Sequence, residues 1–159
     1  MTAKPTAFLA TPSDSAVLMG IGQVAVAAAH LDFVLRRTIG YLKGQPPVHG
    51  DPTTQHDGAE KLRKALRAAA VEKRLSAAQI SHLDKLQTRT ECAQKARNMV
   101  LHGLWTFDPD SNVMNFHSAR NPSATETSPT AESLATLAQK LRALTCAYLD
   151  TRFDGRLDL

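Results

Sequence analysis

The segment with the clearest capacity for chemistry is a short polar motif, Arg97, Asn98 and His102, in the order Arg-Asn-x-x-x-His. Histidine exchanges a proton near neutral pH, and arginine carries a permanent planar cation. Gly103 follows at the position where a left-handed residue caps many helices, so we predict that His102 occupies a last helical turn. The C-terminus of a helix also favours a protonated imidazole. The motif therefore predicts a proton-exchanging group and a cation close together at a helix end.

The predicted helix before the motif has an apolar side and a polar side. The apolar side comprises residues at steps of three, four and seven, namely Leu83, Leu86, Ala93 and Val100. The polar stripe beside it comprises Asp84, Glu91, Asn98 and His102. Arg97 projects toward the apolar side with Thr90 and Leu101, so we expect its stem to be packed and its guanidinium to need a partner.

At this motif the chain resembles a known family. The hexapeptide from Arg97 to His102, with a glycine and a nearby tryptophan behind it, resembles the Arg-Asn-x-x-x-His signature of the HEPN superfamily (higher eukaryotes and prokaryotes nucleotide-binding). That family includes metal-independent RNA nucleases of toxin-antitoxin, phage-defence and RNA-processing systems. It also includes members that only bind nucleotides or partners. The resemblance implies RNA as substrate, no metal or other cofactor, and a homodimer in which two motifs meet to form one composite site.

The resemblance also implies a role for each site residue. His102 would take the proton from the ribose 2′-hydroxyl, and positioned acid–base catalysis contributes roughly 10²–10⁴-fold. Arg97 would hold two phosphate oxygens with its planar fork. Asn98 would orient His102 or the phosphate, because residues four apart on a helix are neighbours. Glu91 would support the site by fixing the imidazole or the Arg97 of a partner chain.

Two other interpretations remain open. In the first, the chain is a non-catalytic bundle of the same type that binds a nucleotide or a partner protein. In the second, it is a plain helical scaffold in which Arg97 pairs with Glu91 or Asp84 and His102 caps a helix. If the chain is a toxin or a phage-defence component, the expected partner is an antitoxin or a nucleotidyltransferase.

Length and composition indicate one globular domain over residues 1–159, with apolar residues making up 43% of the chain. The net charge of +4 is compatible with a polyanion partner but does not require one. We expect a flexible N-terminus over residues 1–12 and a frayed tail over residues 152–159. No apolar signal segment is visible, so a cytoplasmic location is expected. Gln23, His30 and Asp32 interrupt the first apolar run, which argues against a membrane span.

The pattern of apolar residues and capping residues predicts an all-α protein, an up-and-down bundle of four to five helices. The first helix should begin near Ser13 to Ser15 and end at Gly44, and the second should begin with an Asp57–Glu60 capping box. A Ser76–Gln79 capping box should open the motif helix, and the last helix should begin at Ser128. A short β-hairpin over residues 104–117 is appended after the motif helix, and residues 118–128 are expected to be a linker.

The first helix has a heptad-like apolar seam and several small residues. The seam comprises Val17, Ile21, Val24, Ala28, Leu31, Leu35, Thr38 and Leu42. Gly20, Gly22 and the alanines at 27–29 would allow another helix to approach closely. That helix could belong to the same bundle or to a second copy of the chain, and the sequence does not separate the two.

Three further groups of residues have a simple explanation beside a functional one. The basic run of the second helix is either a solvated face or a surface for RNA. His49, Asp51, His56 and Asp57 are metal-ligand types, but their spacing matches no ligand pattern, so no metal site is expected. The two cysteines, Cys92 and Cys146, are expected to be reduced and packed.

Overall fold

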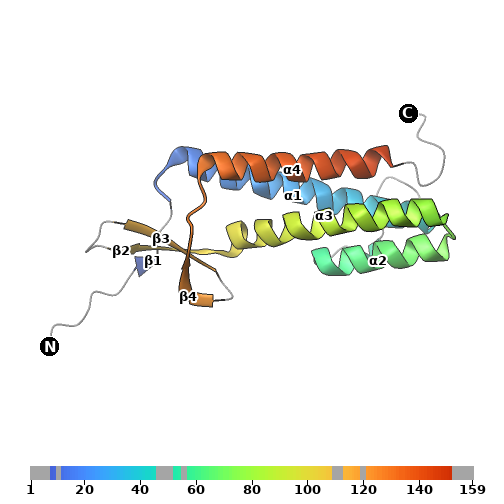
Figure 1. The fold of residues 1–159 in the computed structure, drawn as a ribbon, viewed down its shortest axis with the longest axis horizontal. Coiled ribbons are helices and arrows are strands. Elements are labelled where there is room, and N and C mark those ends of the chain that lie inside the picture. The colour runs from blue at the N-terminus through green and yellow to red at the C-terminus, as the bar shows by residue number, and fades with distance from the viewer. Residues whose placement is uncertain are drawn as a thin grey trace.

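The computed structural model describes residues 8–9, 12–45, 52–54, 57–108, 113–118 and 121–151. Within these residues the chain forms a bundle of four α-helices with a small antiparallel sheet at one end (Figure 1). The predicted all-α bundle with an appended hairpin is therefore confirmed. The tail expected to fray, residues 152–159, lies outside the described residues, which end at Thr151. Most of the N-terminal segment expected to be flexible lies outside them as well.

The four helices begin and end close to the predicted positions. They are α1 (Ser15–Leu42), α2 (Ala59–Glu72), α3 (Ala77–His102) and α4 (Ala131–Asp150), and a 3₁₀ turn η1 (Pro52–Thr54) lies between α1 and α2. Asp14 caps α1 by accepting a hydrogen bond from the Ala16 N–H at 2.8 Å. Gly44, just after α1, has a φ of 75°, which glycine adopts without strain.

The capping boxes were predicted with mixed success. The Ser76–Gln79 box at the start of α3 is confirmed, with both reciprocal hydrogen bonds present. The Asp57–Glu60 box is wrong, because Gly58 is the N-cap residue of α2 and Asp57 pairs instead with Lys61 at 3.7 Å. The box that opens α4 is formed by Thr130 and Ser133, slightly later than the predicted start.

Helix α1 packs against both α4 and α2, and α3 packs against the other three helices, most extensively against α4 (Figure 1). Gly20 near the start of α1 lies against Leu134 near the start of α4, so these two helices run in parallel. His82 near the start of α3 contacts Thr151 at the end of α4, so α3 is antiparallel to both. The core between them is almost entirely aliphatic and includes Val24, Leu31, Leu35, Ile39, Leu62, Leu66, Leu83, Leu134 and Leu141.

The sheet at the end of the bundle contains more than the predicted hairpin. Strands β2 (Leu104–Asp108) and β3 (Val113–Ser118) form that hairpin. Strand β4 (Asn121–Glu126) adds to β3 from the segment expected to be a linker, and the short β1 (Phe8–Leu9) adds to β2. The sheet therefore places the N-terminal strand β1 and the segment before α4 in one sheet with the strand that follows the motif helix.

Gly103 connects α3 to the sheet in a way that differs from the prediction. Its φ of −70° and ψ of 152° are extended rather than left-handed, because the chain passes directly from α3 into β2. Glycine is needed here for space. A Cβ atom at this position would overlap the Phe116 ring and lie 2.6 Å from the Met99 carbonyl oxygen. Phe116 is buried over this junction, and its ring centroid lies 4.9 Å from that of Trp105.

Candidate functional site

The motif arginine is held inside the bundle by an acid from α1. Arg97 Nη2 lies 3.2 Å from Asp32 Oδ2, and Arg97 Nη1 donates to Asn98 Oδ1 at 2.7 Å. The Arg97 and Asp32 side chains are only 19% and 15% exposed. The prediction that the Arg97 stem is packed and that its guanidinium needs a partner is confirmed. Within the chain that partner is Asp32, and not Glu91 or Asp84.

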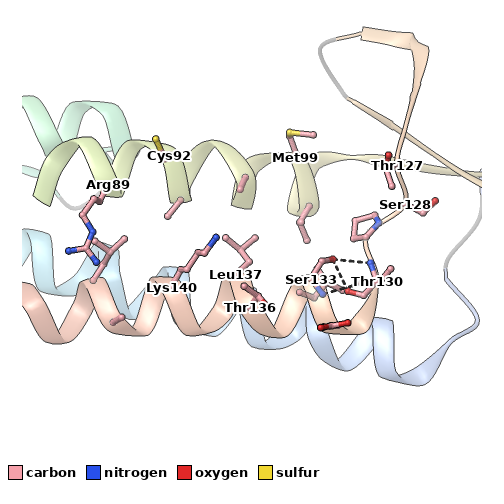
Figure 2. A pocket seen from close by; sticks show the side chains of 18 of the residues that line it. Arg89, Cys92, Met99, Thr127, Ser128, Thr130, Ser133, Thr136, Leu137 and Lys140 are labelled. Carbon is pink, nitrogen blue, oxygen red and sulfur yellow. Dashed lines mark hydrogen bonds between the residues drawn. The ribbon is translucent and has the colours of Figure 1, made fainter. Parts of the chain in front are cut away.

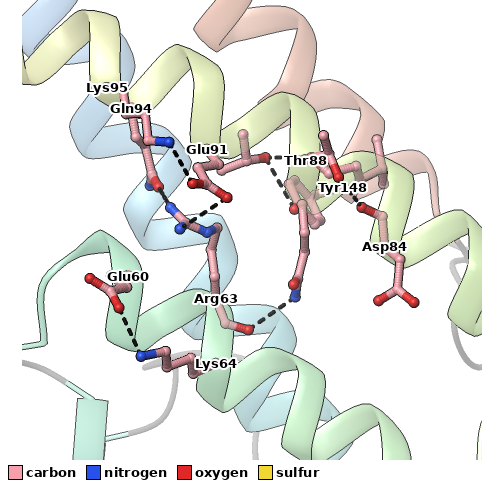
Figure 3. Close-up of polar contacts among 12 residues, drawn as sticks. Glu60, Arg63, Lys64, Asp84, Thr88, Glu91, Gln94, Lys95 and Tyr148 are labelled. Atoms are coloured by element: carbon pink, nitrogen blue, oxygen red, sulfur yellow. Dashed lines mark hydrogen bonds and ion pairs between the residues drawn. The ribbon is translucent and has the colours of Figure 1, made fainter.

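Asp32 is the end of a polar network that crosses three helices, and Figure 3 shows the part of this network around Arg63 and Gln94. Gln94 Nε2 donates to Asp32 Oδ1 at 3.3 Å, and Arg63 Nη1 on α2 donates to Gln94 Oε1 at 2.7 Å. Burial raises the pKa of Asp32, while the cations Arg97 and Arg36 and the Gln94 hydrogen bond act in the opposite direction. The network therefore fixes α1, α2 and α3 relative to one another through charges that are largely removed from water.

Arg97 retains only part of its hydrogen-bonding capacity. Each terminal nitrogen already donates one hydrogen bond within the chain, and Nε is buried with no hydrogen-bond partner in the described part of the chain. Guanidinium has five N–H donors, so some remain. An anion that reached Arg97 would meet these remaining N–H groups, presented in a fixed direction by Asp32 and Asn98.

His102 has the opposite environment. His102 is the last residue of α3, so it occupies the last helical turn as predicted, and its side chain is exposed. Among the described residues it has no hydrogen-bond or ion-pair partner. His102 follows Arg97 by five residues, which turns it about 140° around the helix axis. The two side chains therefore leave the helix in different directions, and the exposed imidazole is accessible to a substrate.

Asn98 and Glu91 line a groove between α2 and α3, with a volume of about 1060 Å³. The Asn98 carboxamide oxygen accepts from Arg97, so Asn98 orients the arginine and not the histidine. Glu91 lies 2.8 Å from Lys95 and 3.6 Å from Arg63, and the Lys95 hydrogen bond is the main reason that the pKa of Glu91 is lowered. Within this chain, Glu91 contacts neither Arg97 nor His102.

The basic run of α2 is largely neutralised. Lys64 pairs with Glu60 at 2.8 Å, and Arg67 pairs with Asp84 at 2.7 Å. Lys61 and Arg63 also have acidic partners. Paired surface charges present little net field to a phosphate backbone. The arrangement favours a solvated face over a surface for RNA.

A second groove of about 1020 Å³ lies between α3 and α4, on the other side of the motif helix (Figure 2). Met99 and Val100, the middle residues of the motif, line it together with Phe116. Arg89 and Lys140 lie at its edge and form no ion pair with another residue in the described part of the chain. This groove is therefore apolar inside, with two free cations beside it.

The described residues contain no group of three or more histidine, cysteine or acidic side chains that could hold a metal ion. His49, Asp51 and His56 lie outside the described residues. The prediction that the two cysteines are packed is wrong, because Cys92 and Cys146 are free and exposed. Their helices turn neighbouring residues toward the core and leave these two positions on the outer faces.

Sequence analysis missed the two residues that hold the motif in place, Asp32 and Gln94. Asp32 was treated only as an interruption of the apolar first helix. A signal was present, since a lone acid in an apolar helix has to find a cation or hydrogen-bond donors when it is buried. The apolar run around it did not indicate which cation that would be.

Comparisons with family models, with curated proteins and with solved structures gave no match for this chain. The resemblance to the HEPN superfamily therefore depends on the motif and on the order of the helices.

Proposed function

We propose that this protein is a metal-independent endoribonuclease of the HEPN type, acting as a homodimer with Arg97 and His102 of both subunits in one composite site. The observation that carries the proposal is the exposed imidazole of His102 at the end of the motif helix, which has no hydrogen-bond or ion-pair partner within the described ranges. A histidine without a structural partner is available for proton transfer near neutral pH. RNA is the proposed substrate.

The chemistry follows from these side chains. One His102 accepts the proton of the ribose 2′-hydroxyl, and the resulting oxygen attacks the adjacent phosphorus. The P–O5′ bond breaks, the 5′-oxygen takes a proton from the second His102, and a 2′,3′-cyclic phosphate is left. Arg97 stabilises the charge on the phosphoryl oxygens through its remaining N–H groups, and Asn98 holds the guanidinium in position. Two histidines are needed, which is why the site requires two chains.

The experiment is cleavage of total RNA and tRNA by the purified protein in excess EDTA, with His102→Ala compared to wild type. We expect cyclic phosphate ends from wild type and a loss of roughly 10²–10⁴-fold in the variant. His82→Ala is the matched control, because His82 is also an exposed histidine on α3 but lies near the other end of that helix. Equal loss in both variants, or cleavage that requires a metal, would contradict the proposal.

Arg97 needs a variant that separates chemistry from folding, because Arg97→Ala leaves Asp32 buried without its cation. Arg97→Lys keeps a positive charge for Asp32 but loses the planar fork. We expect Arg97→Lys to fold and to lose most cleavage. Full activity in this variant would show that the arginine only supports the fold.

The second candidate is a non-catalytic module that binds a nucleotide or a partner protein. It is favoured by one observation, that both terminal nitrogens of Arg97 already donate within the chain. Absence of metal-free cleavage by a folded, dimeric protein would favour this candidate over the nuclease.

A further inference from the structure

Helix α1 carries a second apolar stripe on the side that faces away from the core. It comprises Met19, Gly22, Val26, Ala29 and Phe33, all of them exposed. The three large side chains are 65%, 55% and 48% exposed, in chain order. The spacing alternates steps of three and four, which places the five residues on one face over a length of about 21 Å.

Helix α1 contains more apolar residues than the bundle buries, and the stripe accounts for exposed ones among them. Among the described helices, α1 is the one long and apolar enough to cross a membrane, yet only 33% of its most apolar 18-residue window is buried. From Ser15 to Phe33 the one acidic or basic residue is Asp32, apart from His30. Asp32 points inward to Arg97. The five residues of the stripe are therefore all without charge, and the exposed His30 lies beside them, one turn after Val26.

We propose that this stripe is the contact surface for a second copy of the chain, with the two α1 helices packed antiparallel about a two-fold axis. The argument is the order of side-chain sizes. Met19, Val26 and Phe33 are large, and Gly22 and Ala29 between them are small. Two parallel helices with this seam would place large residues against large and small against small. Antiparallel helices can place Val26 opposite Ala29 and Phe33 opposite Gly22, so that large and small side chains interdigitate.

The sizes also indicate a register. With the two-fold axis between Val26 and Ala29, Val26 lies opposite the partner's Ala29 and Gly22 lies opposite the partner's Phe33. Met19 then lies at the edge of the contact, opposite the partner's Arg36. The same surface then serves both subunits, as a closed two-fold dimer requires. Gly20, Ala27 and Ala28 are not part of this surface, because they are buried inside the bundle. The structure thus assigns some of the small residues of α1 to packing within the chain and leaves Gly22 and Ala29 for the second copy.

A membrane is a less suitable cover for the stripe. Helices that lie on membranes have polar faces rich in lysine and arginine, whereas the first lysine or arginine of α1 is Arg36, beyond the stripe. The opposite side of α1 is occupied by the core and by α4. An uncharged, self-complementary face is better matched by an identical one.

This inference specifies the dimer on which the proposed function rests, but its test needs no RNA. The molar mass of the purified full chain is measured by light scattering at micromolar concentration for wild type, Val26→Glu and Val71→Glu. Val71 on α2 is the matched control, because it is an exposed valine too, at 57%. We expect a dimer for wild type and Val71→Glu. Val26→Glu should be a folded monomer with a dimer dissociation constant raised at least about 100-fold, because each subunit buries a charge.

A monomeric wild type overturns the inference, as does a dimer that Val26→Glu leaves intact. The outcomes also separate the two proposals. A dimer that dissociates with Val26→Glu but does not cleave RNA supports the surface and removes the nuclease. Cleavage by the Val26→Glu monomer supports RNA chemistry and removes the composite site.

The antiparallel arrangement is tested by oxidative cross-linking in a background with Cys92→Ser and Cys146→Ser, two exposed positions. Val26→Cys lies near the two-fold axis and should form a disulfide-linked dimer. Met19→Cys should not, because the two copies of residue 19 would lie about 25 Å apart along the helix axis. Efficient cross-linking at residue 19 would indicate parallel helices and would overturn the proposed arrangement.

Discussion

At the scale of single residues, the Asp32–Arg97 pair decides what the motif arginine can do. Two largely buried charges stabilise a fold only when their geometry and hydrogen bonds offset the loss of water. Here Asn98 and Gln94 supply those additional hydrogen bonds. The guanidinium is consequently fixed in place. A fixed cation has little freedom to lose when it binds an anion, but it cannot move far to reach one.

We predict that Arg97→Met destabilises the protein by about 3 kcal/mol, because it leaves the Asp32 carboxylate buried without its cation. The measurement is the free energy of unfolding from urea titration. Arg67→Met is the control, since it removes a more exposed pair with Asp84 that should contribute less than about 1 kcal/mol. Similar losses in the two variants would mean that the Asp32–Arg97 pair behaves as a surface pair.

Asp32 also predicts a dependence of stability on pH. Burial raises its pKa above the ordinary value of 3.8, so the folded chain holds this proton more tightly than the unfolded chain. The stability that Asp32 contributes is then full below the unfolded pKa and is lost as the pH rises through the folded pKa. We expect the unfolding free energy of wild type minus that of Asp32→Asn to decrease as the pH rises from about 3 toward neutrality. A difference that grows with pH would contradict this expectation.

At the scale of elements, α3 is tied to α4 by one buried polar contact in an otherwise apolar interface. Thr90 Oγ1 donates to the Leu86 carbonyl oxygen at 2.8 Å and lies 3.1 Å from the Tyr148 hydroxyl oxygen. The Tyr148 hydroxyl is therefore the donor of the second bond. Because both side chains are buried, neither can turn to water instead.

We predict that Thr90→Val destabilises the protein by about 1–3 kcal/mol, because the Tyr148 hydroxyl loses its acceptor. Adding Tyr148→Phe should recover part of that loss, since the unpaired hydroxyl is then absent. A double-mutant cycle with urea unfolding measures the coupling. Strictly additive effects of the two substitutions would show that the hydrogen bond does not link the helices energetically.

The junction between α3 and the sheet gives a second prediction at this scale. Gly103→Ala should destabilise the protein by about 1–3 kcal/mol, because the new methyl group overlaps the Phe116 ring. Trp105, the single tryptophan, contacts Phe116, so its fluorescence should report a displaced hairpin. Gly58→Ala is the control, because nothing lies within 4 Å of its added Cβ. Unchanged Trp105 fluorescence in Gly103→Ala would mean that the hairpin tolerates the methyl group.

At the scale of the whole molecule, the surface combines paired charges with a few reactive or apolar features. The formal net charge of the chain is +4. Ion pairs neutralise Lys64 and Arg67 on α2, whereas Arg89 and Lys140 beside the α3–α4 groove form no ion pair with a described residue. Both thiols lie on the outside of the helices.

We predict that both thiols react with a thiol reagent in the folded protein, at a total of two per chain. Exposure, and not unfolding, should control their access. The measurement is a colorimetric thiol titration without denaturant, with Cys92→Ser and Cys146→Ser to assign the two signals. Thiols that react only after denaturation would contradict the exposed positions.

The sequence by itself determined the helices and the hairpin, because their signals are local. Helical periodicity, the Ser76–Gln79 capping box and the alternating residues around a turn each lie within a few residues of one another. The packed stem of Arg97 and the terminal position of His102 followed from the same periodicity. Strand β4 did not follow, because it forms only where the edge of β3 offers it partners.

Only the tertiary structure decided which residue satisfies Arg97 and which small residues of α1 face inward. Asp32 and Arg97 are 65 residues apart in the chain, and no local pattern relates them. Gly20 and Gly22 look alike in the sequence, as two small residues in one apolar helix. In the structure Gly20 lies against Leu134, whereas a Cβ added at Gly22 would meet nothing within 4 Å. A periodic pattern fixes the angle of a side chain around its own helix. The neighbour on that side depends on how the helices pack.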